Sequence, residues 1–240
     1  MKQLETNNYI FNYNENSCAQ EDIEEIANIQ ETCLEYISHI LRLHPNFKIE
    51  YYLCDSAKQV GEIYGDNEPC NGFCDLPNKI YAVYNEDIKC IGFHEDAHII
   101  SYLINRPESV FIREGLAMFF DKLWRGIDNK HIVSYLMKNN NFISVDKLID
   151  DEIFYKYNCA ITYPIAGSFT EWLIYTFGID KYLSFYSLKV DIKKAFKEIY
   201  LMDIAKLSQE YYKFISIFKN DNTLDNRIEF LYKDILFCYK

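Results

Sequence analysis

The sequence has no long hydrophobic run. A membrane-spanning helix needs about 18 or more consecutive apolar residues, and no stretch of this chain approaches that length. Residues 1–17 also lack the apolar segment of a secretory signal peptide. If Met1 is the natural start, we therefore expect a cytoplasmic protein. A chain from which a leader has been removed would look the same, and such a protein would be secreted.

Positive charge is scarce. The chain has 25 Lys and Arg against 36 Asp and Glu, which gives a formal net charge of −11. An acidic surface repels phosphate backbones and anionic lipids, so neither a nucleic acid nor a membrane is expected as a partner. Apolar residues make up 49% of the chain and charged residues 25%, which is typical of a folded protein with a substantial core.

Several functional motifs are missing. The sequence contains no Walker loop, no dinucleotide fingerprint and no GxSxG. Only Cys70 and Cys74 lie close together among the cysteines, so the spacing of a zinc ribbon or finger is absent. We expect most cysteines to be buried free thiols, with a Cys70–Cys74 disulfide as the alternative. The eight cysteines are Cys18, Cys33, Cys54, Cys70, Cys74, Cys90, Cys159 and Cys238.

Hydrophobic periodicity predicts an α+β protein. Apolar residues at helical spacing predict a helix over 19–43, and β-branched and aromatic residues predict strands over 47–54 and 79–84, with a loop and a short strand between them. Helices are predicted over 87–104, 110–124 and 164–177, and the chain from 180 onward is helical in pattern. We expect a strand-containing part, 1–126, and a helical part, 127–240, which together could form one continuous domain.

The most informative segment is the HExxH motif that begins at His94. On a helix, His94 and His98 lie one turn apart on the same face, where two imidazoles can bind one Zn²⁺ ion. Glu95 lies about 100° further round the helix, so it is placed to accept a proton from a metal-bound water. The flanking residues are almost wholly apolar, which predicts a buried helix whose histidines need a shared partner.

Glu114 is the candidate for a third ligand. It lies in the apolar segment FIREGLAMFF, where an unpaired carboxylate would be costly to bury. The break at Asn105-Arg106-Pro107 lets a second helix fold back on the first. The alternative is a surface ion pair between Glu114 and Arg113 or Arg106.

HEDAH followed by EGLA resembles the gluzincin metallopeptidases, in particular the compact peptidase-MA-like group. The similarity extends over roughly residues 47–188 and includes the segment YPIAGSFTEWL from Tyr163. It implies a zincin-like fold, in which a small N-terminal mixed sheet has its edge strand over the HExxH helix and a mainly helical part follows. Residues 79–84 resemble that edge strand.

The resemblance implies a role for each residue at the site. His94, His98 and Glu114 would bind one zinc ion per chain, and Glu95 would be the general base. Tyr163 would stabilise the oxyanion, with Tyr157 as the alternative. An acid usually stands four residues after the zinc-binding Glu, but Met118 occupies that position. The acid that orients a histidine could then be Asp121, on the same helical face as Glu114.

The sequence thus predicts a zinc metallopeptidase that acts on peptide or protein substrates. The alternative is a zinc-binding interaction or regulatory protein without turnover, and a chain that binds no metal is a third possibility. No pattern selects an oligomeric state, or endopeptidase over exopeptidase action. The other histidines, His39, His44 and His131, fit no metal-ligand spacing, and we expect His131 to be solvated. Trp124 and Trp172 are expected to be core residues.

Overall fold

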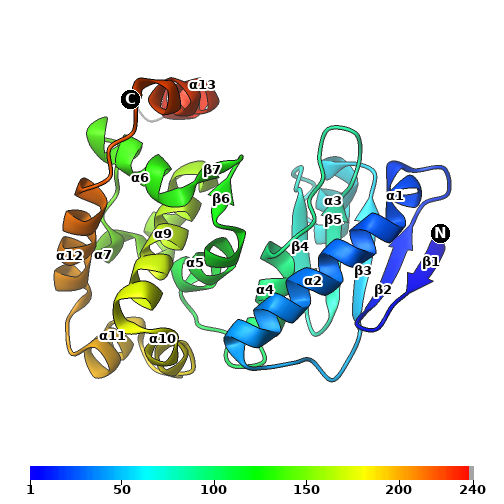
Figure 1. Ribbon diagram of the computed structural model, residues 1–240, viewed down its shortest axis with the longest axis horizontal. Helices are drawn as coiled ribbons and strands as arrows, with labels where there is room; N and C mark the ends of the chain where they lie inside the picture. The colour runs from blue at the N-terminus through cyan, green and yellow to red at the C-terminus, as the bar shows by residue number, and fades with distance from the viewer. Residues whose placement is uncertain (238–240) are drawn as a thin grey trace. The chain divides into compact units, whose positions relative to one another are not determined.

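The computed structural model describes residues 1–237, and the chain divides into two compact units, Met1–Ile104 and Asn105–Lys240. The order of the predicted strands and helices had given parts 1–126 and 127–240. Cys238 lies outside the described residues. The first unit contains a small mixed sheet and the second is mostly helical (Figure 1). The fold class is therefore α+β.

The first unit is built on a five-stranded sheet with the order β1-β2-β3-β5-β4. β3 is parallel to both of its neighbours, whereas β1 and β4 pair antiparallel at the two edges. The strand predicted over 79–84 is present, but it is internal. The edge strand next to it is β4, from the segment predicted to be a loop with a short strand. The strands are β1 (Lys2–Glu5), β2 (Tyr9–Tyr13), β3 (Ile49–Cys54), β4 (Gly72–Asp75) and β5 (Lys79–Val83).

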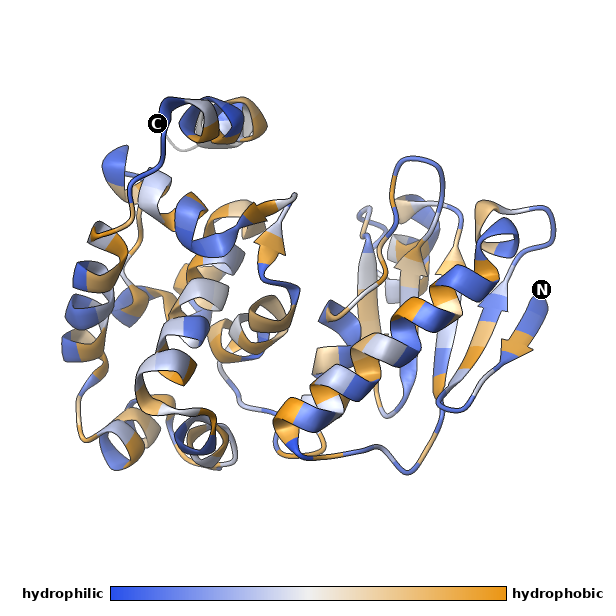
Figure 2. Cartoon of the chain, in the orientation of Figure 1, coloured by the Kyte–Doolittle hydropathy of each residue, from blue (hydrophilic) through white to orange (hydrophobic). Residues whose placement is uncertain are grey.

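Helices cover both faces of this sheet. Tyr51 of β3 shares one face with Tyr9 and Phe11 of β2, and all three are buried against the helices α2 (Ile23–Leu41) and α4 (His94–Ser101). On the opposite face, Cys54 packs against Val60 of α3 (Ala57–Tyr64), because successive strand residues point to opposite sides. Hydrophilic and hydrophobic residues alternate along α2 (Figure 2), as expected of a helix with one buried side.

The helix predicted over 19–43 is interrupted once. A short α1 (Cys18–Glu21) ends at Asp22, where α2 begins. The Asp22 carboxylate accepts hydrogen bonds from the Tyr84 hydroxyl (2.7 Å) and the Lys89 ammonium (3.1 Å), which hold this junction to the sheet. α2 ends at Arg42, whose left-handed backbone cannot continue the helix.

The helix predicted over 87–104 is much shorter than expected. Residues 87–93 are not helical, because the Asn85 side chain accepts from the backbone N–H groups of Asp87 and Ile88, and the chain returns to form a bridge from Lys89 to Tyr84. Such side-chain turns compete directly with helix formation. Helix α4 begins only at His94, after Gly92 with a φ of 121°.

The second unit is organised around the pair α5 and α9. Gly115 of α5 faces α9 so closely that a Cβ atom there would lie 3.0 Å from the carbonyl oxygen of Ala166. Within the described residues, this unit also contains a small hairpin and seven further helices. The elements are α5 (Val110–Asp121), β6 (Leu123–Trp124), β7 (Ile127–Asp128), α6 (Asn129–Lys138), α7 (Val145–Leu148), α8 (Asp151–Phe154), α9 (Cys159–Phe177), α10 (Ile179–Tyr186), α11 (Ile192–Tyr200), α12 (Ile204–Ser216) and α13 (Asn222–Phe237).

Two boundaries in this unit differ from the prediction. α5 ends at Asp121, because Lys122 has a left-handed backbone and leads into β6. α9 begins five residues before Pro164, since the Asn158 side chain caps it by accepting from the N–H of Ala160. Pro164 has no N–H to give to the carbonyl of Ala160. The hydroxyl of Tyr232 in α13 donates to that carbonyl instead, at 2.6 Å.

No strand or helix was predicted individually for β1, β2, α3 or the hairpin of β6 and β7, and α6 to α8 were covered only by the expected helical part over 127–240. The helical pattern from residue 180 onward is confirmed as α10 to α13. None of the helices within residues 1–237 combines the length and apolar character needed to cross a membrane.

Candidate metal centre

The two histidines of the HExxH motif lie on one face of α4. Their ring centroids are 5.0 Å apart and the ring planes are inclined by 83°. His98 is buried, with 5% of its surface exposed, and His94 is half-buried. The predicted arrangement of two imidazoles one helical turn apart is therefore present.

Tyr102 lies one turn beyond His98 on the same face. Its hydroxyl is 3.3 Å from Nδ1 of His98, and the two rings stack with centroids 5.5 Å apart. A hydrogen bond to one ring nitrogen fixes the tautomer and the orientation of an imidazole. Tyr102 was not predicted as a site residue, although its spacing from His98 repeats the spacing between the two histidines.

His94, His98 and Glu114 form a group that could hold a metal ion. One ligand atom from each residue lies within 4.8 Å of the others. Glu114 belongs to α5, where Gly115 to Phe120 are all buried, and its own side chain is half-buried. Two nitrogen donors and one carboxylate oxygen suit a transition metal, because imidazole and carboxylate together are common ligands of such ions.

Glu95 lies against the edge strand of the sheet. A Cβ atom built on Gly72 of β4 would be 3.3 Å from Oε1 of Glu95 and 3.1 Å from Sγ of Cys90. The missing side chain at Gly72 thus leaves space around the carboxylate. A glycine within a short strand can indicate, from the sequence alone, that another group approaches the strand backbone closely.

Asp96, between the two histidines, is fully buried. It accepts hydrogen bonds from the hydroxyl of Tyr9 and, at 3.0 Å, from Nε2 of Gln30. Burial raises the pKa of Asp96 well above its ordinary value; the hydrogen bond from Tyr9 opposes this shift, and the negative charge of Glu95 adds to it. This network was not predicted from the sequence, although an acid inside an apolar helix indicates that it has buried polar partners.

The candidates for the oxyanion-stabilising residue lie in the second unit. Tyr163 is half-buried on α9, with its ring 5.8 Å from that of Trp124 and 6.0 Å from that of Phe154. Tyr157 lies in the turn before α9 and is half-buried too. Their catalytic roles stay predictions.

The residues expected to support the ligands differ in burial. Met118 is a core residue with 1% of its surface exposed. Asp121 is half-buried and ends α5. Its role in orienting a histidine stays a prediction.

His131 is half-buried and has a polar contact that the sequence did not predict. Its Nδ1 lies 2.8 Å from Oδ1 of Asn220, which joins α6 to the segment before α13, so it is not simply solvated. Trp172 is a core residue as predicted, whereas Trp124 is only partly buried. The seven cysteines in the described part of the chain are free thiols, so the Cys70–Cys74 disulfide is not formed.

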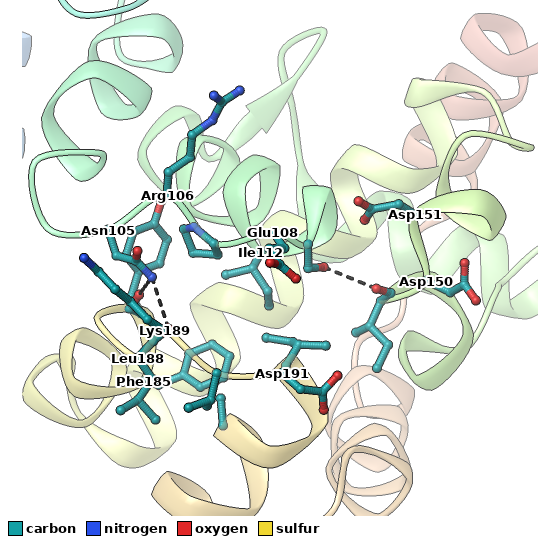
Figure 3. A pocket seen from close by; sticks show the side chains of 17 residues that line it. Asn105, Arg106, Glu108, Ile112, Asp150, Asp151, Phe185, Leu188, Lys189 and Asp191 are labelled. Atoms are coloured by element: carbon teal, nitrogen blue, oxygen red, sulfur yellow. Dashed lines mark hydrogen bonds between the residues drawn. The ribbon is translucent and has the colours of Figure 1, made fainter.

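A separate cavity of about 630 Å³ opens in the second unit (Figure 3). Its lining includes the apolar residues Ile112 and Phe185 and several carboxylates. Asp150 and Asp191 cap helices by accepting backbone hydrogen bonds, and Asp151 accepts from the N–H of Val110. These acids therefore have structural partners, and the cavity contains none of the predicted site residues.

Comparison with known proteins adds no assignment: no family model, curated protein or solved structure matches the chain. The resemblance to gluzincins thus depends on the HExxH and EGLA motifs and on the His94–His98–Glu114 group.

Proposed function

We propose that this chain is a zinc-dependent metallopeptidase in which His94, His98 and Glu114 bind the metal. The observation that carries the proposal is the proximity of their ligand atoms, all within 4.8 Å of one another, combined with the HExxH spacing. Two imidazoles and one carboxylate form the donor set of catalytic zinc sites that keep one coordination position open. We assign Nε2 of His98 as its ligand atom, because Nδ1 faces the hydroxyl of Tyr102.

The chain's own residues would perform the proton transfers. When bound, zinc would polarise the scissile carbonyl and acidify the attacking water. Glu95 accepts a proton from that water and later gives it to the leaving amine. Tyr163 is proposed to donate a hydrogen bond to the oxyanion. In this scheme Gly72 keeps the space beside Glu95 open for the reacting groups.

The substrate would bind along β4. An extended peptide can add a strand to an exposed sheet edge by backbone pairing. The internal position of β5 excludes it from this role, whereas β4 is the edge strand and contacts α4. A peptide on β4 would thus lie close to the carboxylate of Glu95.

The base assignment is tested with Glu95→Gln. The variant should bind one zinc per chain with unchanged affinity and lose about 10²–10⁴-fold in kcat, measured by cleavage of a fluorogenic peptide library. Glu86→Gln, which changes an exposed acid in the preceding loop, is the matched control. A Glu95→Gln enzyme that cleaves as fast as the wild type refutes the role of Glu95.

The ligand assignment is tested by zinc titration. His98→Ala should weaken zinc binding more than about 100-fold, whereas His131→Ala should leave it unchanged, because His131 contacts Asn220 instead. Equal affinities in both variants would refute the metal site.

A second candidate is a zinc-binding protein without turnover. Met118 favours it, because a buried thioether stands where an acid usually supports a zinc-binding histidine. Stoichiometric zinc binding without cleavage of any library peptide would select this function over the peptidase.

A further inference from the structure

Three fully buried polar side chains meet beneath the HExxH helix. Tyr9 comes from β2, Gln30 from α2 and Asp96 from α4, and each has 0% of its surface exposed. Gln30 donates to Oδ2 of Asp96 at 3.0 Å, the hydroxyl of Tyr9 bonds to the same oxygen, and this hydroxyl also lies 3.1 Å from the carbonyl oxygen of Gln30. Burying these groups is costly unless they are paired, so the arrangement is specific.

The amide of Gln30 also binds the backbone that leads into α4. Gly92 donates its N–H to Oε1 of Gln30 at 2.6 Å, and its carbonyl accepts from Nε2 of Gln30 at 3.1 Å. Gly92 has a φ of 121°, which favours glycine, and the following residue, Phe93, is the N-cap of α4 but makes no side-chain capping bond. The Gln30 side chain thus fixes the point at which α4 begins.

We propose that Gln30 is a positioning residue for the metal centre. By holding Gly92 and Asp96 it sets the axial and rotational position of the first turn of α4, which presents His94 and Glu95. This inference depends on the proposed function, because it assigns Gln30 a role in the geometry of that site. α2, which supplies Gln30, lies across the sheet of the same unit (Figure 1).

The position of Gln30 on α2 supports a specific role. Ile26, Gln30 and Leu34 recur at four-residue intervals and are all buried, so an apolar residue would fit the helical pattern at residue 30. Ligand sites tolerate displacements of only about 0.5 Å, and outer partners of ligands typically contribute about 10–100-fold in metal affinity.

The test uses Gln30→Met in the full chain, since Met has a similar length and helix propensity. Zinc affinity is measured by competition with a chromophoric chelator, and coordination geometry by the visible absorption of Co²⁺. We expect zinc affinity to fall about 10–100-fold with an altered Co²⁺ spectrum. Leu41→Ala is the control, because it removes a buried side chain on the same helix about 16 Å away.

The control separates positioning from general stability. Leu41→Ala should destabilise the fold at least as much as Gln30→Met, yet keep zinc affinity within about twofold of wild type. If Gln30→Met fails to fold, Tyr9→Phe keeps the Gln30–Gly92 bonds and removes the hydroxyl that contacts Asp96 and the backbone carbonyl of Gln30. The zinc affinity of Tyr9→Phe should fall severalfold. Wild-type affinity in the folded variant, or an equal loss in Leu41→Ala, overturns the proposal. A wild-type chain that binds no zinc instead refutes the proposed function itself.

Discussion

Replacing Gly115 by alanine should destabilise the second unit, although the same change stabilises most helices. In an open helix, Gly→Ala gains about 1 kcal/mol from helix propensity. Here the added Cβ would lie 2.5 Å from Oγ1 of Thr170 and 3.0 Å from the carbonyl oxygen of Ala166. Thr170 is fully buried, and a backbone carbonyl cannot rotate away. Overpacking of this kind costs up to about 3 kcal/mol, so we expect a net loss of about 2 kcal/mol.

The assay is urea unfolding followed by tryptophan fluorescence. The chain has two tryptophans, Trp124 and Trp172, and both lie in the second unit, so the signal reports on that unit. The loss corresponds to a decrease in Tm of about 4–8 °C. The double variant with Thr170→Ala should recover part of it, because the nearest obstructing atom is gone. A Gly115→Ala protein as stable as the wild type would refute the close packing of α5 on α9.

Other predictions concern metal, pH and capping. Zinc at about 100 times its Kd should stabilise the wild type by about 2.7 kcal/mol, which raises its Tm. A chelator should reverse this rise. The rise should be absent in His98→Ala and present in His131→Ala. Burial raises the pKa of Glu31, but hydrogen bonds from Thr6 and its neighbours in the β1–β2 turn outweigh this effect and lower the pKa below its ordinary 4.5. The stabilisation that ionised Glu31 gives the fold is therefore complete above about pH 4.5, and it is lost as the pH falls through the folded-state pKa. Glu31→Gln should accordingly lower the free energy of unfolding by about 1 kcal/mol at pH 7 and by much less at pH 3. A difference between variant and wild type in urea titrations that stays constant with pH would contradict this. Asn158→Ala should cost about 1 kcal/mol by removing the cap of α9, and Asn158→Asp should restore most of it in the fluorescence assay; no loss in Asn158→Ala would contradict the capping role.

The candidate site was predictable where it depends on local spacing. His94 and His98 are neighbours on any helix that contains them, and burial of the helix follows from its apolar flanks. The prediction was wrong for residues 87–93, where the Asn85 side chain binds the backbone of residues 87 and 88 and the Gln30 side chain binds that of Gly92. Apolar periodicity contains no information about such hydrogen bonds.

Features that depend on distant partners could not be predicted. Nothing in the sequence near Gln30 shows that its amide binds Gly92, 62 residues later. Residues 79–84 were correctly identified as a strand, but whether a strand is internal or at the edge is decided by its neighbours. β4, with its glycine and partly exposed side chains, gave too weak a signal for its edge position to be foreseen.

The bond from Tyr232 to the carbonyl of Ala160 ties α13 to the interior of the second unit. Pro164 leaves α9 with an acceptor that only the final helix supplies with a donor, 72 residues further along the chain. Truncation of the chain before Tyr232 would therefore leave a buried peptide oxygen without this hydrogen bond, at a cost of about 1–3 kcal/mol.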